Sequence, residues 1–263
     1  MPRRNLTYMT TVDHVWAALS WGAVASSGLL AGAAIGTLIR LPHRTIAMTM
    51  SVGAGLLLAG LSFKVAADAT QLIGPLTATL SLLLGAAVFS ASNALLNQLG
   101  AANRKRCGEC LQQANESQKP GSGGAIVLGN ALDGMPEALL LGIALRDPIV
   151  PTALVVAFSV GNFPEALSSA AGMREAGRSH LYVWLTWSAV ATGSALAVAA
   201  GFAGLAELDS VWPPRLQAFG AGALLAMIAE TMIPEAFHDS PRFSGLLAAV
   251  GFGLLLLVDG AHR

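Results

Sequence analysis

The sequence is poor in charged residues. Asp, Glu, Lys and Arg together make up only 11% of its 263 residues, whereas 54% are hydrophobic, and the mean hydropathy is +0.61. Average soluble domains carry about 25% charged residues, so this composition excludes an ordinary soluble domain and indicates a polytopic membrane protein. The 15 basic and 15 acidic residues cancel, which leaves no electrostatic case for a nucleic-acid partner.

Cysteine and catalytic motifs are scarce as well. The two cysteines, Cys107 and Cys110, form one Cys-Gly-Glu-Cys pair in a polar stretch, which supplies at most two ligands of a zinc site and no disulfide framework. The pair is either an idle part of its loop or a metal- or redox-responsive one. There is no Gly-x-Ser-x-Gly or His-Glu-x-x-His motif, so we expect neither an enzyme nor a permanent cofactor.

Long apolar segments dominate the chain. A membrane helix needs about 20 mainly apolar residues, and the sequence offers eight such segments. They are expected at 15–39, 45–67, 73–98, 123–145, 149–173, 181–205, 215–237 and 241–260. The sequence therefore predicts an all-α polytopic fold of eight transmembrane helices that forms a single transmembrane domain over residues 1–263.

Basic residues predict the orientation in the membrane. The connections after the first, third, fifth and seventh segments hold most of the Lys and Arg, including Arg40, Arg104, Lys105 and Arg174. By the positive-inside rule these connections are cytoplasmic, which puts both termini outside a cell membrane. The one long connection, residues 100–122, is rich in Ser, Pro, Gly and Gln and is expected to be a mobile cytoplasmic loop.

The tripeptide Pro-Glu-Ala occurs three times, at residues 136–138, 164–166 and 234–236, each time inside or at the end of an apolar stretch. A carboxylate at this depth costs several kcal/mol unless it is paired, protonated or bound to a cation. The neighbouring proline frees a backbone carbonyl four residues earlier, at Leu132 and Val160 in the first two motifs. Each motif therefore offers oxygen atoms and a bend together.

Further oxygen-bearing side chains share these helix faces. Asp133 precedes Glu137 by four residues and Asn162 precedes Glu165 by three, spacings that place each pair on one face of a helix. Asn130 lies on the Asp133 face, either as an accessory oxygen ligand or as a helix-packing residue. These residues point to a bound cation.

Two further charges lie outside these two segments. Glu230, in the seventh segment, could form a station where an ion enters or leaves. Lys64 near the end of the second segment either pairs with Asp68 four residues later or reaches the acidic site, where it would neutralise a carboxylate without metal.

An internal repeat is visible in the second and seventh segments. Residues 51–60 and 218–227 share a Gly-Ala-Gly pattern followed by aliphatic residues. With the Pro-Glu-Ala motif in both central segments, this favours a three-plus-two-plus-three plan with inverted outer repeats. Transporters often place their binding site where such repeats meet.

These motifs resemble the ZIP (Zrt/Irt-like) family of divalent-cation transporters, as a divergent member. The run Gly161-Asn162-Phe163-Pro164-Glu165-Ala166 is similar to the family's His-Asn-Phe-Pro-Glu-Gly signature, and Asp133-Gly134-Met135-Pro136-Glu137 keeps its Pro and Glu. The resemblance implies that Asp133, Glu137, Asn162 and Glu165 line one metal site near the middle of the bilayer.

The resemblance also implies a function. We expect a permease that moves divalent transition-metal ions into the cytoplasm, with the metal ion and the lipid bilayer as its partners. Carboxylate ligands accept zinc as cargo and leave manganese, iron and cadmium open. The alternative is a non-transporting membrane metal sensor or scaffold. Whether the chain forms a homodimer stays open.

Overall fold

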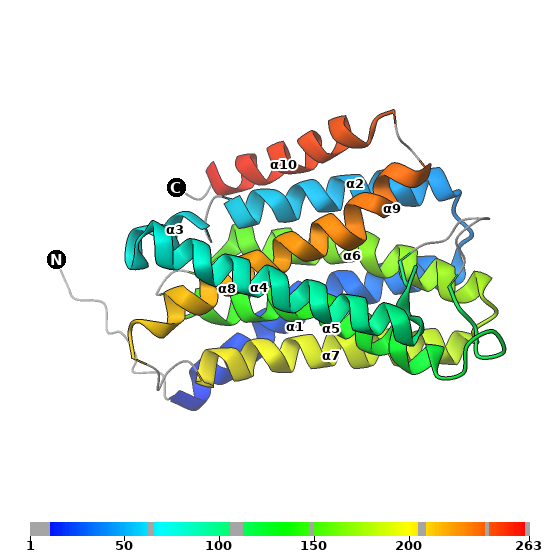
Figure 1. Ribbon diagram of the computed structural model, residues 1–263, viewed down its shortest axis with the longest axis horizontal. Helices are drawn as coiled ribbons and strands as arrows, with labels where there is room; N and C mark the ends of the chain where they lie inside the picture. Colours follow the sequence, from blue (N-terminus) through cyan, green and yellow to red (C-terminus); the bar gives the residue numbers. More distant parts are fainter. Residues whose placement is uncertain are drawn as a thin grey trace.

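The computed structural model describes residues 11–62, 66–105, 113–147, 150–204, 209–239 and 242–260. These residues form helices and connecting turns and no strand, which confirms the predicted all-α class. The long helices run side by side along one axis (Figure 1). They are α1 (Thr11–Leu38), α2 (His43–Gly60), α4 (Pro75–Leu96), α5 (Ser122–Ala144), α6 (Thr152–Glu175), α7 (His180–Gly204), α8 (Trp212–Met227) and α10 (Ser244–Gly260).

Shorter elements continue or join these helices. The helix α3 (Ala66–Ile73) precedes α4, and α9 (Ile233–Asp239) ends the rod that begins with α8. Among the described elements, the π-helical turn η2 (Asn97–Ala101) follows α4, and the π-helical turn η4 (Ile228–Met232) lies between α8 and α9. The wider turn of η4 lies directly before Pro234, whose missing N–H cannot serve a regular α-helical turn.

Six helical rods in the described part of the chain are long and apolar enough to cross a membrane. They are His14–Leu38, Pro75–Ala101, Ser122–Ala144, Thr152–Glu175, His180–Gly204 and Trp212–His238. The predicted count of eight is not reached by this measure. The segments predicted at 45–67 and 241–260 form α2 and α10, of 18 and 17 residues. Helix α2 begins with the polar residues His43, Arg44 and Thr45, and residues 63–65 lie outside the described residues.

Successive long helices nevertheless alternate in direction (Figure 1). The start of α1 and the end of α10 lie at one end of the bundle, called here the terminal end. The connections after α1, α4, α6 and α9 lie at the opposite end, the loop end. Each long helix therefore runs opposite to the long helix before it in the chain.

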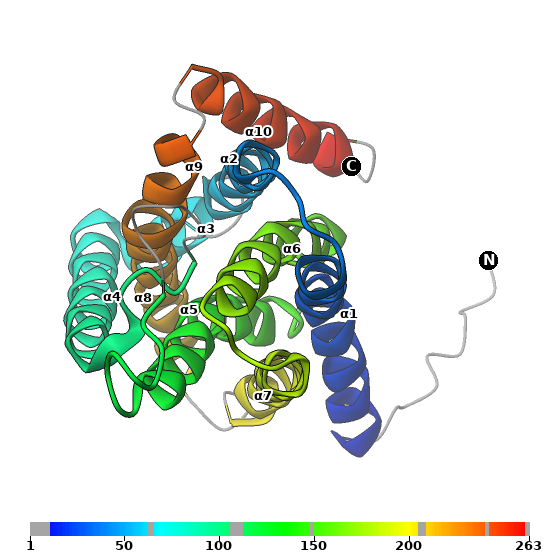
Figure 2. The ribbon, with the colours of Figure 1, turned by 90° about the vertical axis from the view of Figure 1, so that its right-hand side faces the viewer.

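Glycines set how closely the helices approach. Gly28, Gly32 and Gly36 on α1 face the backbone of α6, and a Cβ atom at Gly32 would collide with the carbonyl oxygen of Phe163. This contact makes α6 an interior helix, since it packs against α2 as well as α1. Seen along the bundle, α6 is surrounded by its neighbours (Figure 2), and its side chains Asn162, Glu165, Ser168 and Ser169 are buried.

The start of α5 is held by a side chain from the preceding loop. The carboxylate of Glu116 accepts hydrogen bonds from the backbone N–H groups of Gly121 and Gly123, both at 2.7 Å, and pairs with Arg178 at 3.1 Å. These donors, the two backbone N–H groups above all, lower the pKa of Glu116 below its ordinary value. This part of the predicted mobile loop is therefore tied to the bundle.

Candidate functional site

Helices α5 and α6 bring the predicted acidic residues together inside the bundle. Both helices continue through their internal prolines, Pro136 and Pro164. The side chains of Asp133, Glu137, Asn162 and Glu165 are all buried, and Asp133 is 0% exposed. The side-chain amide of Asn162 donates to the backbone carbonyl of Ala25 on α1 at 3.4 Å. All four predicted residues thus lie in the interior of the bundle.

Two basic residues that the sequence analysis assigned to a mobile loop reach this cluster. Arg104 binds Asp133 through two parallel contacts, Nε to Oδ2 at 2.9 Å and Nη2 to Oδ1 at 2.6 Å. Lys105 Nζ lies 2.6 Å from Glu165 Oε1 and 3.1 Å from Asp133 Oδ2. The ammonium group of Lys105 therefore bridges two of the four residues predicted to bind metal.

Three described residues of the predicted loop 100–122 lie in the interior of the bundle. Arg104 and Lys105 are each 3% exposed, and Gln113 is also buried. Arg104 and Lys105 form ion pairs there with Asp133 and Glu165, and Gln113 donates hydrogen bonds to the carbonyls of Arg104 and Ser169. Cys107 and Cys110, as well as Lys64, lie outside the described residues.

Some oxygens of the cluster remain without a partner. Glu137 Oε1, Glu165 Oε2 and Asn162 Oδ1 are buried and accept no hydrogen bond from the described residues. Buried acceptors without a donor are costly, and carboxylate and amide oxygens are ligands for hard and borderline divalent cations. These three oxygens are the part of the cluster that the described contacts of Arg104 and Lys105 leave unpartnered.

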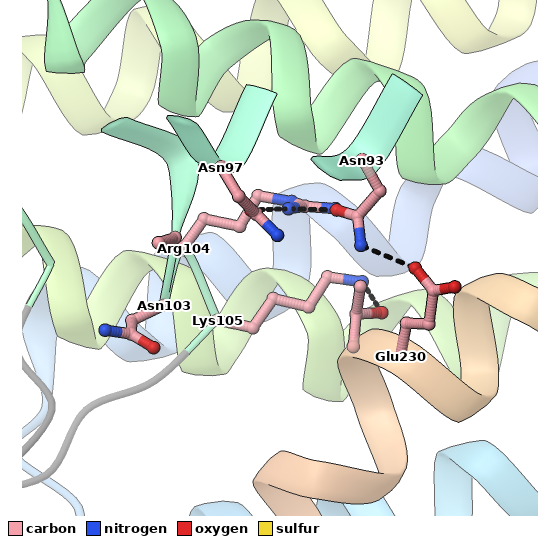
Figure 3. Close-up of a pocket in the computed structure, with 8 residues that line it drawn as sticks. Asn93, Asn97, Asn103, Arg104, Lys105 and Glu230 are labelled. Atoms are coloured by element: carbon pink, nitrogen blue, oxygen red, sulfur yellow. Dashed lines mark hydrogen bonds between the residues drawn. The ribbon is translucent and has the colours of Figure 1, made fainter. Parts of the chain in front are cut away.

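Glu230 lies at the edge of the cluster rather than inside it. Its carboxylate is exposed, accepts a short hydrogen bond from Ser90 Oγ and accepts a second from Asn93 Nδ2 at 2.7 Å. Asn93 in turn accepts from Arg104 Nη1 at 2.8 Å. A pocket of about 140 Å³ opens here, and Figure 3 shows the basic side chains beside Glu230. The pocket is lined by Asn93, Asn97, Ala102, Asn103, Arg104, Lys105, Glu230 and Thr231.

Asn130 is separate from the carboxylates. Its side chain exchanges hydrogen bonds with Ser169 on α6, at 3.2 and 3.4 Å. Of the two interpretations that the sequence allows, the geometry favours the helix-packing residue, since these bonds join α5 to α6.

Arg104 and Lys105 are the functional residues that sequence reasoning missed. They follow a membrane segment in a basic run, a pattern that indicates a cytoplasmic loop under the positive-inside rule. The available signal was a charge deficit, because the segments predicted at 123–145 and 149–173 supply three buried acids and no basic side chain beside them. Among the described residues, no group of three or more His, Cys, Asp and Glu side chains is arranged to hold a metal ion, and Lys105 lies between two of the candidates.

Fold and site together define a polytopic α-helical membrane protein with a buried cluster of acidic and basic residues at its centre. No protein-family model matches the sequence, and the comparison with curated proteins gives no match. Support for any function therefore comes from the cluster itself.

Proposed function

We propose that this chain is a ZIP-like permease that carries divalent transition-metal ions into the cytoplasm. The observation that carries the proposal is that Glu137 on α5, and Asn162 and Glu165 on α6, each bury a side-chain oxygen that has no hydrogen-bond partner among the described residues. A membrane protein keeps such acids only where a cation or proton compensates them. A divalent ion with ligand distances of about 2.0 to 2.6 Å would satisfy these oxygens together.

The packing of the outer helices supports the three-plus-two-plus-three plan with eight crossings. Gly55 on α2 faces the carbonyl of Ala248 on α10, and Gly251 faces that of Val52. Helices α8 and α4 show the same pattern of contacts. Gly222 on α8 faces the carbonyl of Leu82 on α4, and Gly85 on α4 faces the carbonyl of Phe219 on α8. Val52 and Gly55 occupy the same places in the 51–60 repeat as Phe219 and Gly222 in the 218–227 repeat. Two such halves around a central site are typical of transporters that alternate access.

Metal flux into reconstituted vesicles tests the proposal. In proteoliposomes that contain a metal-sensitive dye, the wild-type chain is expected to admit Zn²⁺, Mn²⁺ or Cd²⁺. A Glu137→Gln, Glu165→Gln double variant should lose most of the flux because it keeps the shape of the site but removes two charges. The matched control is Glu175→Gln, which changes an exposed acid of α6, the helix that carries Glu165. Unchanged flux in the double variant would refute the permease.

One observation favours a second candidate, a membrane metal sensor or scaffold that does not transport. Arg104 and Lys105 already compensate Asp133 and Glu165, so the cluster is stable without continuous exchange of ions. A sensor would bind metal at equilibrium yet pass none across the vesicle membrane. Binding and flux measured on the same preparation separate the two candidates.

A further inference from the structure

The basic segment that enters the site is held by more than its charges. The side-chain amide of Gln113 donates to the carbonyl of Arg104 at 2.7 Å and to that of Ser169 at 3.0 Å. Ser168 Oγ hydrogen-bonds the carbonyl of Lys105 and lies 2.9 Å from Glu235 Oε1. Residues 104 and 105 are thus docked against α6 by neutral hydrogen bonds as well as by ion pairs.

Lys105 adds contacts on the side of η4. Its Nζ lies 3.2 Å from Thr231 Oγ1 and 3.8 Å from Met227 Sδ. Together with Asp133 and Glu165, these neighbours surround the ammonium group with acceptors from three helical rods. A side chain that is 3% exposed and contacted in this way is not a solvated lysine that happens to point inward.

We propose that Lys105, supported by Arg104, is a tethered cation that competes with the transported metal for Asp133 and Glu165. The proposal rests on the proposed function and adds a specificity-determining residue to it. A metal ion on the same oxygens would lie within a few ångströms of the ammonium group, where like charges repel strongly in a buried site. The two cations therefore exclude one another, and metal binding requires residues 104–105 to withdraw toward the loop end.

The competition has a consequence for selectivity. A monovalent ion that displaced Lys105 would bring no more charge than it removed, and it would lose its water shell as well. A divalent ion brings twice the charge of the ammonium group to the carboxylates of Asp133 and Glu165. The tethered lysine thus favours divalent over monovalent ions at these two carboxylates.

Removal of the competitor tests the proposal. If the lysine-withdrawn state makes up about 1 to 10% of the metal-free protein, deletion of the ammonium group should tighten the apparent metal Kd by roughly 10- to 100-fold. We expect this for Lys105→Met, measured by titration calorimetry of the purified full chain with Cd²⁺ and Zn²⁺. Lys119→Met is the matched control, because it removes a lysine of the same loop that bonds only the carbonyl of Gln98 among the described contacts.

A second variant guards against misfolding of Lys105→Met. Gln113→Ala keeps every charge and weakens only the docking of the segment, so the metal Kd should tighten by a smaller factor. Trypsin gives an independent measure on the wild-type chain. Metal should accelerate cleavage after Arg104 and Lys105, identified by mass spectrometry, and leave cleavage after Arg178 unchanged.

The outcomes separate the two proposals. If the wild type binds and transports metal but Lys105→Met and Gln113→Ala bind it with the wild-type Kd, the tethered competitor is refuted and the permease stands. The competitor is refuted in the same way if metal does not change cleavage after Lys105. If no variant binds metal and the wild type shows no flux, the permease is refuted and the competitor with it.

Discussion

At the scale of single residues, Asp133 is the most constrained group in the cluster. It is completely buried and receives three charge-assisted contacts, two from Arg104 and one from Lys105. Burying two cations and an anion costs desolvation energy that only good geometry recovers. The parallel contacts with Arg104 supply this geometry, so Asp133 fixes the position of both basic residues.

Replacement of Asp133 by Asn should therefore destabilise the fold. The variant leaves Arg104 without its carboxylate at a buried position, a loss of about 3 to 5 kcal/mol in comparable cases. Thermal unfolding of the purified chain, followed by tryptophan fluorescence, measures the change. Glu230→Gln is the control, because its carboxylate is exposed and its loss should cost only about 1 kcal/mol. An equal decrease in unfolding temperature for both variants would show that the buried ion pair of Asp133 with Arg104 stabilises the fold no more than the exposed carboxylate of Glu230 does.

The same residues show what the sequence could predict about the site. Glu137, Glu165, Asp133 and Asn162 were predictable because a carboxylate in an apolar helix needs a partner, and i to i+4 spacing fixes the helix face. The positions of Arg104 and Lys105 could not be predicted from the sequence. Their positions depend on a kink inside η2, where Gly100 adopts a φ of 116° that favours glycine. No periodic pattern encodes such a kink.

At the scale of helices, the α1 and α6 contact controls the position of the site. Glycines four residues apart on α1 face backbone carbonyls four residues apart on α6, at Ser159, Phe163 and Leu167. Close contact of this kind stabilises helix pairs in membranes through van der Waals packing. Because Phe163 lies between Asn162 and Pro164, movement of this part of α6 would move the ligands of the candidate site.

A methyl group at Gly32 should accordingly separate the two helices. The Cβ of Gly32→Ala would meet the Phe163 carbonyl oxygen and the Leu167 backbone nitrogen, and such overpacking costs about 1 to 3 kcal/mol. We expect a lower unfolding temperature and weaker metal binding together. Gly253→Ala on α10 is the control, since a Cβ there meets nothing within 4 Å. Wild-type behaviour of Gly32→Ala would mean that α1 and α6 do not depend on this contact.

Some helices could be predicted from the sequence and others could not. The six long apolar helices follow from hydropathy alone, because about 20 apolar residues have few alternatives to a membrane helix. Hydropathy alone does not predict the shorter helices α2 and α10, the separate helix α3 or the π-helical turns. They depend on single residues such as Pro75, the first residue of α4, and Pro234, and on packing against neighbours.

At the scale of the whole molecule, the repeated register of α2 with α10 and of α8 with α4 relates the two halves of the bundle. The Gly-Ala-Gly pattern in 51–60 and 218–227 made a repeat visible in the sequence. Which helix each repeat would pack against was not visible, because Gly85 and Gly251 lie in segments with little other similarity. The long helices alternate in direction (Figure 1), and the side of the membrane that each end of the bundle faces can be tested.

Residues at the two ends of the bundle should face opposite sides of the membrane. Ser117 is exposed in the loop-end connection, and Gln71 is exposed in α3 at the terminal end (Figure 1). Single cysteines at these positions, in a chain whose Cys107 and Cys110 are replaced by serine, report their side through a membrane-impermeant maleimide. Because the loop-end connections carry most of the basic residues, Gln71→Cys should react in intact cells and Ser117→Cys only after permeabilisation. The reverse result would invert the proposed direction of uptake, and reaction of both in intact cells would contradict the alternating bundle.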